Sequence, residues 1–197
     1  MARMPSAERR RQLVEAAIRA MTRDGVARTT TRSICAEAGV SLSVFHYCFD
    51  SKQALLEAAI ESINDTYVVH VMSAVEPRAT LHDTVRGALG TYWKHVMAHP
   101  AEHMLTYELT QYALREEGFE QLARAQYEQY VASGTTLIEQ VCAVCEVEPK
   151  VPVGLLAHLL AAMIDGLTLQ YLVLGDERTA AALLDATAEQ LVTLMGG

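Results

Sequence analysis

The sequence of 197 residues lacks an uninterrupted apolar run of the length that a membrane-spanning helix needs, about 20 residues. Its most apolar tract, residues 153–175, is broken by His158, Asp165 and Gln170. We therefore expect a buried helix there and no membrane partner. The first residues, MARMPSAERRRQLV, carry charges where a secretory signal has its apolar region. Secretion is not expected.

Proline, cysteine and β-branched runs are also scarce. Only five prolines and four cysteines occur, whereas alanine, leucine and glutamate are abundant. Four cysteines in a chain without a targeting signal favour reduced thiols in a cytoplasm over a disulfide framework. The composition predicts an all-α protein.

Charge is distributed unevenly along the chain, whose net charge is −8. Residues 1–60 hold nine Lys/Arg against six Asp/Glu, and residues 61–197 hold seven against eighteen. A basic N-terminal segment on an acidic remainder is the pattern expected when only that segment meets a polyanion.

Helical spacing of apolar residues predicts four N-terminal helices. The first runs over residues 6–24, where Leu13, Ala17 and Met21 share a face before Gly25. A second, capped by Thr30 or Thr31, ends at Gly39, and a third follows over residues 41–49 with Ser41 as its cap. A long fourth begins near Asp50, which has capping-box spacing to Gln53. Pro and Gly punctuation then predicts helices near 80–98, 101–115, 118–146, 153–174 and 177–195.

Two short helices joined by a tight turn at residues 39–41 form a helix-turn-helix, whose second helix enters the major groove of DNA. The stretch TTRSICAEAGVSLSVFHYCFDSKQALLEA resembles the N-terminal domain of TetR-family bacterial transcription regulators. The detailed resemblance covers residues 8–60. It implies a DNA-binding domain over residues 1–50, joined by a long helix to a ligand-binding and dimerisation domain over residues 51–197.

The third helix has two faces. Val40, Phe45 and Phe49 fall on the side toward the first two helices, whereas five residues point away from it. Exposed apolar side chains in a major groove can touch thymine methyl groups, and a serine can bond to base edges. The resemblance implies phosphate contacts at Thr31, at His46 with Tyr47, and at Lys52. The predicted DNA-binding residues are Thr31, Arg32, Ser41, Leu42, Ser43, Val44, His46, Tyr47 and Lys52.

The sequence departs from the family pattern at a few positions. Ser43 stands where glycine is usual, His46 where tyrosine is usual, and Cys48 where histidine or tyrosine is usual. These changes leave the target sequence undetermined. Arg3, Arg9, Arg10 and Arg11 are interpreted either as a solvated face or as contacts to neighbouring phosphates or the minor groove.

The last two helices are predicted to form a homodimer. Ala157, Ala161 and Gly166 permit close approach, and the final helix supplies apolar surface through Leu183, Leu184, Leu191 and Leu194. The alternative is an intrachain core. A dimer would read a palindromic double-stranded operator.

Aromatic, thioether and a few polar side chains are frequent in the middle helices. Such a mixture is typical of small-molecule sites, although any one of these residues taken singly is more often core than ligand contact. Glu108 and Asp165 could favour a cationic ligand. The predicted ligand-binding residues are Tyr67, His70, Trp93, Met97, Met104, Tyr107, Glu108, Tyr112, Tyr127 and Met163.

Two short motifs suggest other chemistry. HPAEH at 99–103 matches a zinc-peptidase pattern, but Pro100 is expected to begin a helix and leave His99 at its cap. CAVC at 142–145 is a single metal-like pair inside an apolar pattern, best interpreted as packed thiols. No phosphate-binding glycine loop appears. We expect no metal, no other cofactor and no catalytic residues.

The sequence therefore predicts a cytoplasmic, homodimeric repressor released from its operator by a small organic effector, and not an enzyme. One alternative is an all-α enzyme or carrier without sequence-specific DNA binding. A second keeps DNA binding but replaces the organic effector with a metal or redox signal at the cysteines and histidines.

Overall fold

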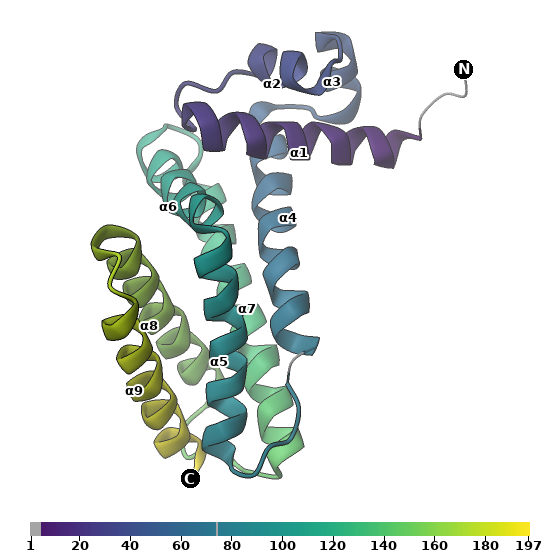
Figure 1. The fold of residues 1–197 in the computed structure, drawn as a ribbon. Coiled ribbons are helices and arrows are strands. Elements are labelled where there is room, and N and C mark those ends of the chain that lie inside the picture. Colours follow the sequence, from purple (N-terminus) through teal and green to yellow (C-terminus); the bar gives the residue numbers. More distant parts are fainter. Residues whose placement is uncertain (1–4, 74) are drawn as a thin grey trace. The chain divides into compact units, whose positions relative to one another are not determined.

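A computed structural model describes residues 5–73 and 75–197, and the side chains of all of these except 66–70. Arg3, a candidate for phosphate or minor-groove contacts, lies outside the described residues. The described part is helical and contains no strand, which confirms the all-α class. Its helices are α1 Ser6–Asp24, α2 Thr31–Ala38, α3 Leu42–Cys48, α4 Lys52–Ser73, α5 Leu81–Ala98, α6 Pro100–Arg115, α7 Glu120–Cys145, α8 Val153–Leu174 and α9 Glu177–Met195 (Figure 1).

The chain divides into two compact units. The first, here called the head unit, contains the residues up to Asn64 together with Ala101–Gln126. The second, the body unit, contains Asp65–Pro100 and Tyr127–Gly197. The division lies within α4 and α7, and it groups α6 with the N-terminal helices. The sequence predicted neither this grouping nor a boundary beyond residue 50.

The head unit is built on α1, which packs against both α2 and α3 (Figure 1). The face predicted for α1 is buried, since Leu13, Ala17 and Met21 have no exposed surface. The start of α4 adds a buried stripe to the head unit. Its members are Leu55, Leu56, Ala59, Ile60 and Ile63. Burial of this stripe explains why the unit extends past residue 50.

Side-chain caps define where the short helices begin. Thr30 caps α2, as one of the two predicted alternatives had it, because its hydroxyl accepts a hydrogen bond from Ser33 N. Ser41 precedes α3 but makes no side-chain cap. The predicted cap at Asp50 is wrong: the Ser51 hydroxyl accepts from Ala54 N at 3.1 Å and begins α4. Asp and Ser both cap helices well, so spacing alone could not choose between adjacent candidates.

In the body unit α9 packs against both α5 and α8. The shared core includes Val85, Leu89, Leu156 and Leu160. Ala157, Leu184 and Leu191, which were predicted to lie at a dimer interface, are also buried in this core, so the alternative of an intrachain core is correct for these three residues. Only part of α8 is covered in this way. Among the described residues, α8 is the helix long and apolar enough to cross a membrane by length and composition, which for one helix is weak evidence.

Candidate functional site

Helix α3 is anchored through one face. Phe45 and Phe49 are 1% and 2% exposed, with ring centroids 5.9 Å apart. Val40, expected beside them, is only half-buried. Burial of these two rings fixes which side of the seven-residue helix faces outward.

The outward face of α3 carries the predicted group of side chains. Leu42 is 36% exposed and Tyr47 65% exposed, and Ser43 and His46 are also exposed. Val44 is half-buried. The Ser41 and Ser43 hydroxyls lie 2.8 Å apart and form a hydrogen bond. One short helix therefore presents to the surface an apolar side chain, a serine hydroxyl, and the imidazole and phenol groups of His46 and Tyr47, which can donate hydrogen bonds.

The turn before α3 depends on Gly39. This residue ends α2 with φ +66°, in the left-handed region that glycine enters without strain. Val40 N then donates to Cys35 O at 2.9 Å and closes the turn. At the other end of α2, Thr31 is half-buried and Arg32 is exposed.

Helix α1 is fastened to the helix-turn-helix by two side chains whose contacts the sequence did not predict. The Arg10 guanidinium donates to Cys48 O at 2.9 Å and lies 4.1 Å from the centre of the Phe49 ring. Gln12 Nε2 donates to Ala38 O at 2.9 Å. Arg10, a candidate for phosphate contacts, joins α1 to the end of α3. No local sequence pattern marks such a contact between residues 38 positions apart.

Part of the positive charge of the head unit is neutralised by Glu37. Its carboxylate accepts from Arg19 at 3.1 Å and from Arg23 at 2.8 Å. These hydrogen bonds hold the pKa of Glu37 below its usual value. Arg19 and Arg23 are thus committed to a structural ion-pair network.

Lys52 lies against an aromatic ring at the start of α4. Its ammonium is 4.8 Å from the centre of the Tyr112 ring and 3.5 Å from the Tyr112 hydroxyl. Burial lowers the pKa of Lys52, partly opposed by the charge of Glu116. The predicted phosphate-binding lysine is therefore half-buried and held by α6.

The predicted ligand-binding residues do not form one set. Met104, Tyr107, Glu108 and Tyr112 lie on α6 in the head unit, whereas Trp93, Met97, Tyr127 and Met163 belong to the body unit. The side chains of Tyr67 and His70 lie outside the described residues. Two α6 members, Glu108 and Tyr112, contact other parts of the head unit.

In the body unit, Asp165 on α8 and Tyr127 on α7 form a close pair. The Tyr127 hydroxyl donates to Asp165 Oδ2 at 2.7 Å, and the Tyr130 ring lies 5.6 Å from the Tyr127 ring. Burial raises the pKa of Asp165, an effect only partly offset by the Tyr127 hydrogen bond. Burial also raises the pKa of Tyr127, and the Asp165 carboxylate adds to it. A partly buried carboxylate beside two phenol rings is suited to an organic cation.

The body unit contains further aromatic residues that make contacts within it. Trp93 is buried and packs edge-on against Tyr171, with centroids 4.9 Å apart. The Tyr92 hydroxyl lies 3.4 Å from the Thr168 hydroxyl, and burial raises the pKa of Tyr92. Met97 is exposed and Met163 half-buried.

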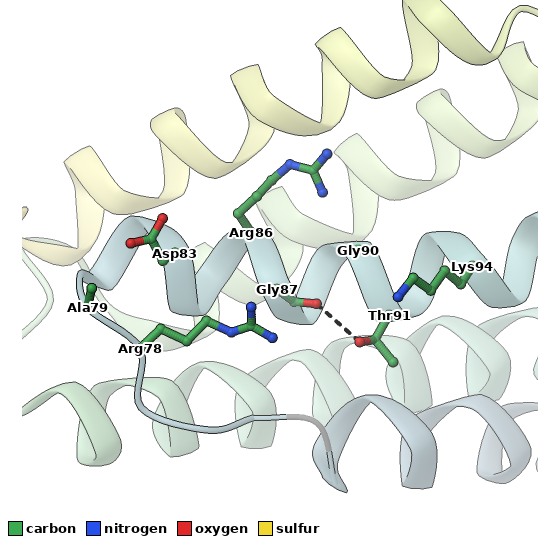
Figure 2. A pocket seen from close by; sticks show the side chains of 8 residues that line it. All are labelled: Arg78, Ala79, Asp83, Arg86, Gly87, Gly90, Thr91 and Lys94. Atoms are coloured by element: carbon green, nitrogen blue, oxygen red, sulfur yellow. Dashed lines mark hydrogen bonds between the residues drawn. The ribbon is translucent and has the colours of Figure 1, made fainter.

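A cleft of about 600 Å³ lies on another part of the body unit, along α5 from the segment before it to Lys94 (Figure 2). The lining residues are Arg78, Ala79, Asp83, Arg86, Gly87, Gly90, Thr91 and Lys94. The Arg78 guanidinium rests on Gly87, where a Cβ would lie 2.6 Å from it, and Arg86 pairs with Asp185. No predicted ligand-binding residue lines this polar, cationic cleft.

The two rival motifs have ordinary structural positions. His99 ends α5 and Pro100 begins α6, as the sequence predicted. Cys142 and Cys145 are free thiols on α7, and burial raises the pKa of Cys142. Within the described residues, no group of three or more His, Cys, Asp or Glu side chains is arranged to hold a metal ion.

Two models of known protein families match this chain, one in its N-terminal part and one in its C-terminal part. The family model of bacterial regulatory proteins of the tetR family matches residues 13–59. A second model, of the C-terminal region of BetI-type transcriptional repressors, matches residues 77–196.

Individual relatives agree with these matches. The nicotine-responsive transcriptional repressor HdnoR of Paenarthrobacter nicotinovorans is 27% identical over 169 residues, 86% of each protein. The regulator BetI of Rhizobium meliloti is 35% identical over 82 residues, 40% of each.

Solved structures share the fold. A putative TetR-family regulator from Rhodococcus sp. superposes with a TM-score of 0.77 at 21% identity, covering 96% of this chain and 100% of that one. The multidrug-binding protein EbrR, solved with imidazole, superposes with a TM-score of 0.66 at 25% identity, covering 96% and 91%.

Proposed function

Because the chain belongs to the TetR family of bacterial transcription regulators, we propose that the outward face of α3 reads the operator of this ligand-responsive repressor. The observation that carries the proposal is the exposure of Leu42 and Tyr47 on a helix anchored by two buried phenylalanines. Leu42 and Val44 are suited to thymine methyl groups in the major groove, and Ser43 to base edges. Ser41 stands beside Ser43 and bonds to it.

Phosphate contacts are proposed at the two ends of the helix-turn-helix. Thr31 and Arg32 lie in the first turn of α2, and His46 and Tyr47 lie in the last turn of α3. Lys52, at the start of α4, is the fifth. Such contacts fix the register of a protein on DNA and contribute most of the salt-dependent affinity.

We propose that the repressor works as a homodimer on a palindromic operator. Leu155, Leu169, Val173 and Leu174 on α8 and Leu183 on α9 are between 37% and 71% exposed. An apolar surface of this kind on two adjacent helices is suited to the same surface of a second copy. Two heads would then read half-sites about one helical turn apart, roughly 34 Å.

The effector is proposed to be a small organic cation bound in the body unit at Asp165 and Tyr127. The hydrogen bond between these side chains, and the burial of the carboxylate, support a site for positive charge. Trp93, Met97 and Met163 are the further proposed contacts, with Tyr67 and His70. The relative HdnoR is described as nicotine-responsive, and nicotine is an amine.

Release from DNA is proposed to be a population shift. The effector would bind more tightly to a state in which the two heads of the dimer cannot engage both half-sites, and it can shift the equilibrium only by that difference in affinity. The regulator would act in the cytoplasm, where its DNA lies, without a catalytic activity of its own.

The test is binding to labelled DNA from the region upstream of its own gene, followed by titration with nicotine and with neutral aromatic compounds of similar size. We expect a complex that prefers the upstream sequence. Nicotine should dissociate this complex from the DNA, and the neutral compounds should not. Equal effects of both kinds of compound would contradict the proposal that the effector is a cation, but they would not contradict the proposal that the protein is a repressor.

A further inference from the structure

One face of α6 lies against the turn that leads into the helix-turn-helix. Glu108 Oε1 accepts a hydrogen bond from Val26 N at 2.7 Å, across 82 residues of chain. Val26 itself is fully buried. A buried amide left without an acceptor is costly, so this carboxylate stabilises the turn between α1 and α2.

The close approach depends on Gly25. A Cβ at this position would lie 3.0 Å from Glu108 Oε1, and the residue adopts φ +86°. The same turn is closed by Thr29, whose buried hydroxyl donates to Gly25 O at 2.8 Å. The turn is therefore shaped to receive the carboxylate from α6.

One turn further along α6, Tyr112 supports the other side of the helix-turn-helix. Its ring lies under the Lys52 ammonium, and Phe119 packs edge-on against it with centroids 5.5 Å apart. Lys52 is the first residue of α4, four residues after the end of α3. Glu108 and Tyr112 thus contact the segments that immediately precede α2 and follow α3.

The other side of α6 is fastened to α7. The Thr110 hydroxyl donates to Gln126 Oε1 at 2.9 Å, and Gln126 Nε2 donates to Thr106 O at 3.3 Å. Gln126 is 1% exposed, and the next residue of the same continuous helix is Tyr127. Helix α6 is therefore held between α7 and the two flanks of the helix-turn-helix.

We propose that Glu108 and Tyr112 are positioning residues for operator binding. In this role they act through protein contacts, without binding DNA themselves. They set the orientation of α2 and α3 by holding the turn before α2 and the start of α4 against α6. The assignment rests on the proposed DNA-binding function of α3, and it gives Glu108 and Tyr112, which the sequence predicted as ligand-binding residues, a different role in the head unit.

The test compares conservative and non-conservative variants for affinity to the upstream operator DNA without effector. Glu108→Ala removes the acceptor for Val26 N and should weaken binding about tenfold or more, the effect expected for a lost hydrogen bond to a charged group. Glu108→Gln keeps an acceptor oxygen and should stay within about threefold of wild type. Tyr112→Leu should weaken binding, and Tyr112→Phe, which keeps the ring, should not. Glu117→Ala, an exposed charge just beyond α6, is the control.

Each variant is measured well below its melting temperature, with circular dichroism to confirm that it is folded. If Glu108→Ala only lowers the melting temperature while its operator affinity equals that of wild type, the positioning role is wrong. If Glu108→Gln binds as weakly as Glu108→Ala, the hydrogen bond is not the cause. Failure of the wild-type protein to bind the operator would instead overturn the proposed function.

Discussion

Tyr47 is the most exposed aromatic side chain of α3, and we propose that its hydroxyl donates a hydrogen bond to a DNA phosphate. Tyr47→Ala should weaken operator binding by about three- to tenfold, the net value of a neutral hydrogen bond. Because the side chain is uncharged, the salt dependence should stay the same. Lys52→Ala should instead reduce the slope of log K against log salt by about 0.9. Fluorescence anisotropy over a salt series measures both, and unchanged affinity in both variants would remove their phosphate role.

Val44, one turn earlier, should act on sequence preference. Val44→Ala removes two methyl groups and should lower the preference for the wild-type base at one operator position, by about threefold to tenfold. A screen of single-base operator variants measures this. A preference of the same size at every operator position in the variant and in wild type would show that Val44 does not contact a base.

Asp165 is expected to make the free energy of unfolding depend on pH. Burial raises its pKa, so the folded protein retains a proton that the unfolded chain releases between the ordinary aspartate value and the raised one. The free energy of unfolding therefore falls as pH rises through that window. Asp165→Asn should be more stable than wild type at neutral pH, and this gain should vanish as pH falls below about 4. Thermal melts from pH 3 to 8 measure it; a variant less stable than wild type at pH 7 would contradict the argument.

The residues that the sequence could predict are those fixed by local periodicity. The helical period separates Phe45 and Phe49 from Leu42 and Tyr47, because faces of a helix follow from spacing alone. Arg10, Glu108 and Lys52 could not be assigned in this way. Each meets a partner 38 to 82 positions away, and such a contact has no local signal.

At the scale of helices, α3 cannot be stable by itself. It has seven residues, whereas isolated helices shorter than about 12 are marginal in water. Its structure comes from packing of Phe45 and Phe49. Phe45→Ala should therefore destabilise the head unit by about 3–5 kcal/mol and abolish DNA binding.

Phe45→Leu fills most of the same volume and should cost about 1 kcal/mol and keep binding. Chemical denaturation followed by circular dichroism checks both variants. Full stability of Phe45→Ala would mean that the ring does not anchor the helix.

The helix boundaries were predictable because proline, glycine and capping residues mark them. Pro100 begins α6 and Gly175 ends α8, as predicted. The grouping of α6 with the head unit could not be predicted from the sequence, because the contacts of Glu108 and Tyr112 join residues that are far apart in the sequence. For the same reason the predicted ligand-binding residues divide between two units.

At the scale of the whole molecule, the exposed apolar residues of α8 and α9 should hold two copies together. Leu169→Glu with Val173→Glu should give a monomer that binds the palindromic operator at least tenfold more weakly, because each head then binds alone. Light scattering after gel filtration measures the mass. Leu114→Glu, at a leucine of α6 whose exposure lies between those of Leu169 and Val173, is the control and should leave the dimer intact. A dimer that survives the double substitution would place the interface elsewhere.

The central claim, that α3 reads an operator, is tested most directly by anisotropy titration of upstream DNA and of a scrambled duplex at several salt concentrations. We expect binding to the upstream DNA at least 1,000-fold tighter than to the scrambled duplex at physiological salt, a ratio within the usual range for specific regulators. Equal affinity for both duplexes at every salt concentration would contradict the claim that α3 reads an operator.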